Sequence, residues 1–306
     1  MSWKLALKLS ATVLIGVTII IYQKQLVGGM TVMRMAAGGH PRRCPLGDAL
    51  NSYASTDALE RRAAVIARNA RLLESDPAGL DLYEAGTERI WMPRGALNEI
   101  AYDLAEQESA IYDYRGLGAR PGDIVLDAGA NVGLYTRHAL KQRASRVIAI
   151  EPVPPNLECL RRNFRDEIAA GRVVVYPKGI WNREDTLEMH LNPDNAAAHS
   201  FVTWSPRATL MTLPLTTVDK IVNDLGLAKV DLIKMDIEGA ERRALAGSVE
   251  TIRRFRPRMA ICVYHLDDDP VEVPEKVRAA RGDYHEAVGS CVWLGNEVRP
   301  KVCFYY

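Results

Sequence analysis

Five short apolar runs, separated by segments with helical periodicity, constrain this chain more than any other feature. The runs cover 123–129, 146–152, 172–179, 230–236 and 258–265. Each is rich in branched residues and almost lacks polar alternation, as expected for strands that are buried on both faces. The intervening segments place apolar residues on one stripe, and the segment after the second run does so with Leu157, Leu160, Phe164 and Ile168. The pattern predicts a doubly wound α/β sheet.

We assign the domain that contains this sheet to residues 120–306, and we expect smaller elements around the sheet. Residues 182–216 interrupt the alternation, which predicts a β insertion over the sheet. The C-terminal tail has hairpin-like alternation and could supply antiparallel edge strands. Upstream, residues 55–119 are expected to form a helical and hairpin extension, and residues 28–54 a linker that contains Gly and Pro.

The extension itself divides into three segments by pattern. Residues 55–74 have apolar side chains at helical spacing, which predicts an amphipathic helix. Residues 82–93 are typical of a short hairpin, and residues 96–114 of a second helix.

An apolar stretch at residues 5–22 is long enough to be a transmembrane helix. Its eighteen residues are interrupted only by Lys8, and a spanning helix needs roughly 17 to 25 residues. A cleaved signal peptide and a buried core helix are the competing interpretations. We expect an uncleaved single-pass anchor within residues 1–27. Lysines and arginines lie on both sides of the stretch, and their distribution leans slightly toward a cytosolic body.

Composition limits the class of protein. The chain is 48% hydrophobic and 25% charged with a net charge of +1, which is typical of a globular protein and argues against nucleic-acid binding. Its five cysteines are scattered and form no CxxC pair or zinc-type cluster, so a reducing compartment is expected. Cys262 lies in an apolar run and is interpreted as a small core residue.

A glycine-rich turn, "DAGANVG", follows the first apolar run at residues 127–133. Gly129 and Gly133 permit a tight turn and close backbone approach, and the helix that follows presents free amides. A dinucleotide site would instead have the pattern G-x-G-x-x-G. Here Asp127 adds a negative charge that would oppose a pyrophosphate and favour an ammonium or a sulfonium. The alternative is an ordinary strand-closing turn in which Asp127 caps the helix.

Glu151 ends the second apolar run, 24 positions after Asp127. A carboxylate at the end of the neighbouring strand accepts hydrogen bonds from both hydroxyls of a ribose in adenosyl-binding sites and dinucleotide sites. Alternatively, Glu151 is a surface acid before Pro152. The two acids at adjacent strand ends together suggest S-adenosylmethionine as the cofactor.

A third group of polar residues lies in "VDLIKMDIEGAE", residues 230–241. Strand geometry would place Lys234, Asp236 and, if the extended backbone continues, Glu238 on one side. Charged residues at the rim of a buried sheet are costly unless they are paired or functional. They could also cap the next helix and neutralise one another. His265 ends the next run at the same rim and is a further candidate.

These stretches, together with "EPVPPNLECLRRN" and "LTTVDKIVNDLG", resemble the FkbM-type methyltransferases over roughly residues 85–270. The resemblance implies a Rossmann-like class I methyltransferase fold. It also implies transfer of a methyl group from S-adenosylmethionine to a hydroxyl of a glycan, lipid-linked or secondary-metabolite acceptor. The cofactor-binding residues that it implies are Asp127, Gly129, Ala130, Asn131, Gly133, Glu151, Pro152 and Gly179. The segment "KGIW" at 178–181 departs from the alanine-bearing turn that is more common in relatives.

Methyl transfer to a hydroxyl needs a base for its proton, and Asp236 is the first candidate and His265 the second. Lys234 and Glu238 are expected to orient the acceptor or tune those groups, and no metal is expected. Two other functions fit the sequence less well. A nicotinamide-dependent oxidoreductase would need G-x-G-x-x-G, and a non-catalytic membrane adaptor would not need the charged strand end.

Overall fold

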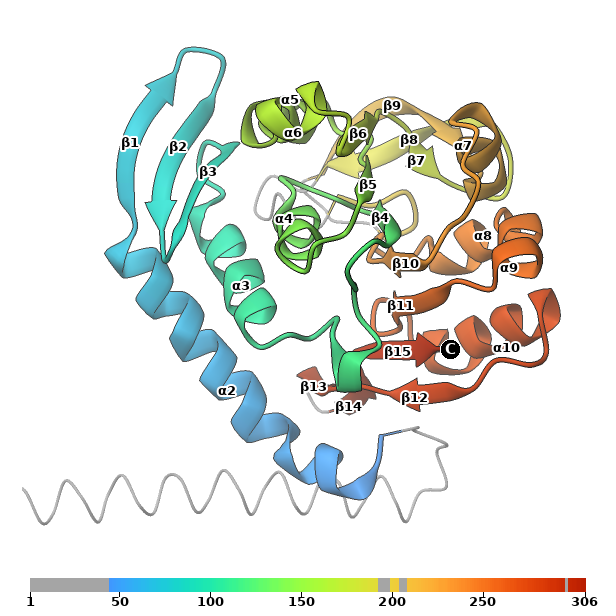
Figure 1. Cartoon of the computed structure of the whole chain (residues 1–306). Helices are drawn as coiled ribbons and strands as arrows, with labels where there is room; N and C mark the ends of the chain where they lie inside the picture. Colours follow the sequence, from blue (N-terminus) through green and yellow to red (C-terminus); the bar gives the residue numbers. More distant parts are fainter. Residues whose placement is uncertain (1–43, 192–198, 204–207, 295–296) are drawn as a thin grey trace, which may run out of the picture.

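The computed structural model describes residues 44–191, 199–203, 208–294 and 297–306. At its centre lies a seven-stranded sheet with the order β12-β15-β11-β10-β4-β5-β6 (Figure 1). Its strands are β4 (Ile124–Ala128), β5 (Arg146–Ile150), β6 (Val173–Tyr176), β10 (Leu232–Met235), β11 (Arg258–Cys262), β12 (Glu286–Val288) and β15 (Val302–Tyr305). The five apolar runs form the parallel part, β6-β5-β4-β10-β11, and β15 pairs antiparallel with β11 and β12. The doubly wound sheet and its antiparallel edge are therefore confirmed.

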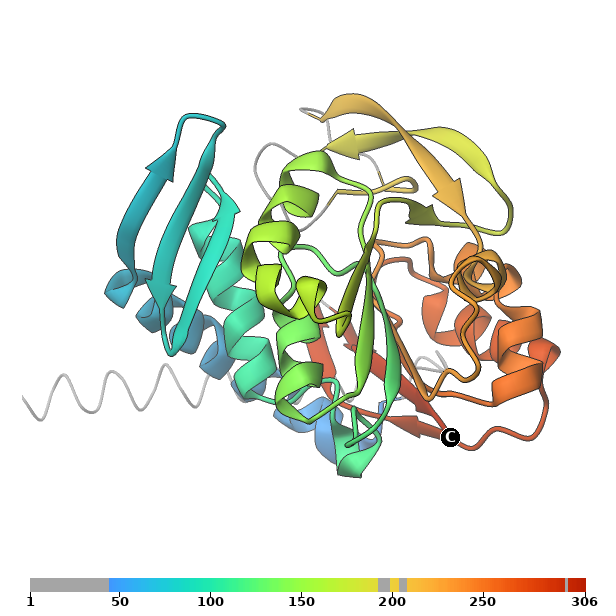
Figure 2. The ribbon, with the colours of Figure 1, turned by 45° about the horizontal axis from the view of Figure 1, so that its top comes forward.

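Helices cover both faces of this sheet (Figure 2). The helices of the sheet domain are α4 (Leu134–Lys141), α5 (Pro154–Asn163), α6 (Arg165–Ala169), α7 (Val218–Asp224), α8 (Glu241–Ala246), α9 (Val249–Phe255) and α10 (Asp269–Ala280). Side chains of adjacent residues in a strand pack into the two hydrophobic cores on opposite faces of the sheet. Leu126 packs in the core beneath α7 to α10, whereas Val125 packs with Tyr135 of α4. Burial on both faces explains why these strands lack polar alternation.

Two expected helices are each divided in two. The helix expected after β5 breaks at Phe164, between α5 and α6, and the helix expected after β10 breaks at Gly247, between α8 and α9. A Cβ at Gly247 would lie 2.3 Å from the carbonyl oxygen of Trp181, so only glycine fits this close approach. The expected β insertion is a small sheet of β7 (Gly179–Ile180), β8 (Asp185–Leu191) and β9 (Thr209–Thr216).

The N-terminal extension consists of α2 (Leu46–Asn69), a three-stranded antiparallel sheet and α3 (Leu97–Glu108), followed by a short 3-10 turn at Tyr114–Gly116. The strands are β1 (Arg71–Asp76), β2 (Leu80–Ala85) and β3 (Glu88–Pro93). The hairpin at 82–93 is confirmed. However, α2 begins inside the stretch expected to be a linker, and the end of the helix expected at 55–74 is instead strand β1. Ile66, Ile90 and Ile100 join Val132 in one core, which fixes the extension to the α4 side.

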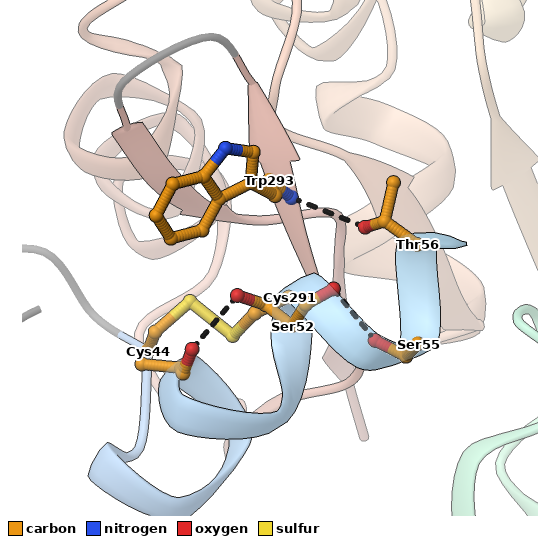
Figure 3. The surroundings of a disulfide bond; sticks show 7 residues. Cys44, Ser52, Ser55, Thr56, Cys291 and Trp293 are labelled. Atoms are coloured by element: carbon orange, nitrogen blue, oxygen red, sulfur yellow. Dashed lines mark hydrogen bonds between the residues drawn. A yellow bond between two sulfur atoms is a disulfide. The ribbon is translucent and has the colours of Figure 1, made fainter. Parts of the chain in front are cut away.

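A disulfide between Cys44 and Cys291 joins the start of α2 to the hairpin β13 (Cys291–Leu294) and β14 (Glu297–Pro300) (Figure 3). Beside it, the Trp293 amide donates to Thr56 Oγ1 at 3.4 Å, and the ring of Trp293 meets Tyr53 edge-on. The sequence did not predict this disulfide, and the expectation of a reducing compartment stays a prediction against which the bond argues. The partners lie 247 residues apart, and sequence alone does not give the pairing of such distant cysteines.

Within the ranges given above, no helix is both long and apolar enough to cross a bilayer. The anchor expected at residues 1–27 lies outside the described residues.

Candidate active site

Two adjoining pockets open at the carboxyl ends of the parallel strands, near the reversal of strand order between β4 and β10. The β5 pocket is lined by, among others, Gly129, Asn131, Glu151, Pro152, Asn156, Lys178, Gly179, Ile180, Met189, His199, Phe201, Asp236, Ile237 and Glu238. The α3 pocket is lined by, among others, Tyr102, Asp103, Glu106, Gln107, Tyr112, Gly129, Ala130, Asn131, Lys234, Asp236, Glu238 and Tyr264. The residues common to both are Gly129, Asn131, Asp236 and Glu238. A ligand in one pocket would therefore meet a ligand in the other at these four residues.

Asp127 lines neither pocket. Its side chain is fully buried, accepts a hydrogen bond from Thr136 Oγ1 at 2.6 Å, and lies 3.3 Å from the ammonium of Lys234. The charge expected to face a ligand is thus matched inside the protein. Asp127 instead joins the end of β4 to the first turn of α4.

The glycines of the turn serve close packing. Gly129 has φ +74°, and a Cβ there would lie 1.9 Å from the carbonyl oxygen of Asp236. Gly133 has φ +96°, and a Cβ there would lie 2.1 Å from the ring of Phe164. Gly129 and the neighbouring Ala130 also donate their amides to the carbonyl oxygen of Ile150. Gly129 and Ala130 reach a pocket wall, whereas Gly133 does not.

Glu151 lies where the sequence predicts, at the end of β5 in the wall of the β5 pocket. Its carboxylate accepts hydrogen bonds from the Asn131 amide at 3.1 Å, the Val153 amide at 2.9 Å and Asn156 Nδ2 at 3.3 Å. Burial nevertheless raises the pKa of Glu151 to about 7, because these bonds only partly replace the lost water.

Pro152 and Gly179 also line the β5 pocket, together with residues that sequence reasoning missed. Asn156 could have been found, since it lies in the first turn of α5, five positions after Glu151. Met189 and Phe201 come from the β insertion and carried no recognisable signal.

Lys234, Asp236 and Glu238 all line the α3 pocket, so they lie on one side as predicted, although no continuous strand connects them. Strand β10 ends at Met235, and Glu238 has φ +54°, so the extended backbone does not reach it. The Lys234 ammonium turns toward Asp127 and also donates to the carbonyl oxygen of Gly129 at 2.9 Å. Asp236 and Glu238 face both pockets. Tyr112, which the sequence did not indicate, donates its hydroxyl to Asp236 Oδ2 at 2.6 Å.

His265 lies behind these two carboxylates, with only 4% of its side chain exposed. Its Nε2 is 3.3 Å from Asp236 Oδ1 and 3.6 Å from Glu238 Oε1, and its Nδ1 is 3.1 Å from Glu241 Oε1. The same Glu241 oxygen accepts the Ile237 amide at 2.9 Å, which fixes the loop after β10. Glu241 is a residue that sequence reasoning left out of the site.

The electrostatics of this group distinguish the two candidate bases. Burial alone would lower the pKa of His265, but the three carboxylates around it raise that pKa well above its ordinary value. Burial alone would raise the pKa of Asp236, but the neighbouring His265 and the charge of Lys234 hold it well below its usual range. Burial raises the pKa of Glu238. Near neutral pH, His265 is therefore an imidazolium and Asp236 a carboxylate.

A family model described as "Methyltransferase FkbM domain" matches residues 127–284, which is more than half of the chain. The chain belongs to the FkbM methyltransferase family. It is an enzyme that uses S-adenosylmethionine, and the fold, the match and the acidic residue at the end of β5 agree on this point. The resemblance seen in the sequence is thereby confirmed.

Characterised relatives of this FkbM methyltransferase align with about half of it. It is 29% identical over 188 residues to the 31-O-demethyl-FK506 methyltransferase FkbM of Streptomyces tacrolimicus, covering 50% of this chain and 70% of the relative. It is 26% identical over 179 residues to the 2-O-methyltransferase NoeI of Sinorhizobium fredii, covering 52% and 72% respectively. Three further relatives are covered over less than two thirds of their length. A crystal structure of methyltransferase FkbM from Methylobacillus flagellatus is 18% identical with a TM-score of 0.44, over 85% of this chain and 60% of that one.

One group of side chains in this FkbM methyltransferase could hold a cation. Ligand atoms of Asp236, Glu241 and His265 lie within 4.8 Å of one another. A protonated His265 would bring the same carboxylates together without a metal, since it supplies a positive charge at their centre. The expectation that no metal is required stays a prediction.

Proposed function

We propose that the protein is an O-methyltransferase that binds S-adenosylmethionine in the β5 pocket and its acceptor hydroxyl in the α3 pocket. The observation that carries this proposal is the wall that the two pockets share, formed by Gly129, Asn131, Asp236 and Glu238. Methyl transfer needs sulfonium and nucleophile in line at contact distance, and such a wall is where two ligands would meet. The names of two relatives, the 31-O-demethyl-FK506 methyltransferase and the 2-O-methyltransferase, support oxygen as the attacking atom.

The β5 pocket suits an adenosyl compound along its whole length. Glu151 accepts the ribose hydroxyls in our assignment, with Asn156 beside it. Ile180, Met189 and Phe201 provide apolar surface for the adenine. At the other end, Asp236 and Glu238 place negative charge beside the sulfonium, which a pyrophosphate would not tolerate. A nicotinamide dinucleotide is therefore disfavoured.

The chemical step exchanges one bond for another. The acceptor oxygen forms a bond to the methyl carbon while the bond from carbon to sulfur breaks, which leaves neutral S-adenosylhomocysteine. The hydroxyl proton passes to Asp236, which is ionised and faces both pockets. His265 is already protonated in our assignment, so it holds Asp236 in place and does not act as the base. A base of such low pKa is weak, so positioning contributes most of the rate.

Calorimetry and a labelled-methyl assay test this proposal. The full chain should bind S-adenosylmethionine, and Asp236→Asn should weaken that affinity by at most about tenfold, because Glu238 remains beside the sulfonium, while it lowers kcat by roughly 10² to 10⁴. The change is isosteric, thermal unfolding checks that the variant is folded, and Glu108→Gln on the exposed end of α3 is a matched control. Full activity in Asp236→Asn would exclude it as the base. Failure of the wild-type chain to bind the cofactor would overturn the whole proposal.

We further propose that the catalytic body works in an oxidising compartment, because disulfides such as Cys44–Cys291 persist there. If residues 5–22 form an anchor, the body then lies on the side away from the cytosol, opposite to the orientation that charge counting favoured. Protease protection in sealed membranes tests this orientation. Digestion of the body from the cytosolic side would contradict it.

A further inference from the structure

One side of the α3 pocket is built from a segment outside the family match at 127–284, and the other side from the strand ends and the glycine-rich turn inside it. Helix α3 contributes Tyr102, Asp103, Glu106 and Gln107 to its wall, and Lys301 lies behind that wall. The strand ends contribute Asp236, Glu238 and Tyr264. The N-terminal extension therefore contributes one wall of the pocket in which we place the acceptor.

The charges in this wall are unequally compensated. The Lys301 ammonium contacts the Glu106 carboxylate, and the Lys234 ammonium lies 3.3 Å from Asp127, so both cations are already paired. Asp103, Asp236 and Glu238 present carboxyl groups to the pocket, His265 contacts the last two from outside the pocket lining, and the described wall contains no arginine. Burial and the charge of Asp236 raise the pKa of Asp103 to about 7, which is the expected effect of crowded acids. An anionic acceptor would meet repulsion without a partner.

The rings of Tyr102 and Tyr264 add flat apolar surface to the same pocket wall. The Lys301 ammonium lies 5.3 Å from the ring centre of Tyr102 and 5.4 Å from that of Tyr264. One buried cation therefore fixes both rings. Aromatic rings beside carboxyl groups match a sugar ring, which has C–H faces that pack on aromatic surface and hydroxyls that donate to carboxylates.

We propose that the α3 pocket selects an uncharged polyhydroxylated acceptor, such as a hexopyranose ring, with Tyr102 and Asp103 as specificity-determining residues. This inference rests on the proposed methyltransferase function. In it, the ring packs on Tyr102 and Tyr264 while its hydroxyls donate to Asp103 and Glu238. The hydroxyl nearest Asp236 faces the methyl group. Phosphorylated sugars and uronic acids are excluded by charge.

Matched pairs of methyl hexopyranosides and the corresponding methyl hexuronosides, which differ by a carboxylate at C6, test the inference with methyl-labelled S-adenosylmethionine. The full chain should label hexopyranosides with a kcat/KM at least about tenfold above that for the paired uronosides. Asp103→Asn should raise KM for the hexopyranoside, and Asp103→Arg should shift the preference toward the uronoside. Tyr102→Ala should raise KM more than Tyr102→Phe, which keeps the ring. Glu108→Gln, on the same helix and exposed, should change neither value.

Calorimetric titration with S-adenosylmethionine separates failure of this inference from failure of the proposed function. Equal or better labelling of uronosides, an unchanged preference in Asp103→Arg, or no labelling of any sugar, each with cofactor affinity intact, overturns the inference alone. If Asp103→Arg or Tyr102→Ala loses cofactor affinity, we take that variant as misfolded. The conservative variant of the same residue, Asp103→Asn or Tyr102→Phe, then provides the test of the inference. Absence of cofactor binding in the wild-type chain overturns the proposed function itself.

Discussion

Lys234 reaches Asp127 across the point where the strand order reverses, with 3.3 Å between Nζ and Oδ1. The two residues are neighbours in register on β10 and β4, and both are buried. A buried ion pair contributes little net stability, but removal of one member leaves an uncompensated charge. We therefore expect Asp127 to stabilise the glycine-rich turn and to affect the cofactor only indirectly.

Asp127→Asn is expected to lower the free energy of unfolding by about 3 to 5 kcal/mol, because it leaves Lys234 buried and unpaired. The double variant Asp127→Asn with Lys234→Met should recover at least half of that loss, since it removes both charges. Urea unfolding measures the difference, and Asp166→Asn, which is 90% exposed on α6, is the control. Wild-type stability in Asp127→Asn together with a large loss of cofactor affinity would mean that Asp127 contacts the ligand directly.

Glu151 gives a pH dependence whose sign follows from its raised pKa. The folded state holds this proton up to a pKa of about 7, against 4.5 in the unfolded chain. Between pH 4.5 and about pH 7 the folded protein thus binds more protons than the unfolded chain. The contribution of Glu151 to stability is therefore complete below pH 4.5 and is lost as the pH rises through about 7. Glu151→Gln should therefore stabilise the free protein at pH 8 by up to about 3 kcal/mol.

The same substitution should weaken cofactor binding by roughly ten- to a hundredfold, because the ionised carboxylate is the better acceptor for ribose hydroxyls. For the wild-type protein, affinity should fall as the pH is lowered below about 7. Thermal unfolding and calorimetry at pH 6 and pH 8 measure both effects. A Glu151→Gln variant that is less stable than wild type at pH 8, or that binds equally well, would contradict this account.

The sequence allowed prediction of the parallel part of the sheet because each of its five strands is an apolar run that local pattern reveals. For the same reason Glu151 and Asp236 could be placed at strand ends. Partners could not be predicted in this way. Tyr112 meets Asp236 across 124 positions, and Cys44 meets Cys291 across 247, so only the folded chain brings them together. The pairing of Lys234 with Asp127 was not predicted either, because period-two geometry gives the side of a strand on which a residue lies but not the partner that its long side chain reaches.

Loss of the disulfide should destabilise the protein without changing the active site. Cys44→Ser with Cys291→Ser is expected to lower the free energy of unfolding by about 2 to 5 kcal/mol, because the bond closes a long loop. Neither cysteine lines the β5 or the α3 pocket, so cofactor affinity should be unchanged. Thermal unfolding with and without reductant measures the effect. Alkylation of both residues in the unreduced protein would show that the bond does not form.

Methyl transfer is expected to continue after treatment with EDTA. The carboxylates of Asp236, Glu238 and Glu241 surround His265, whose raised pKa keeps it positively charged near neutral pH. That charge occupies the place between Asp236 and Glu241 where a divalent cation would bind, and methyl transfer from a sulfonium needs no further electrophile. The assay compares protein dialysed against EDTA with protein supplied with Mg²⁺ or Mn²⁺. Activity that disappears on chelation and returns with one of these ions would instead identify Asp236, Glu241 and His265 as metal ligands.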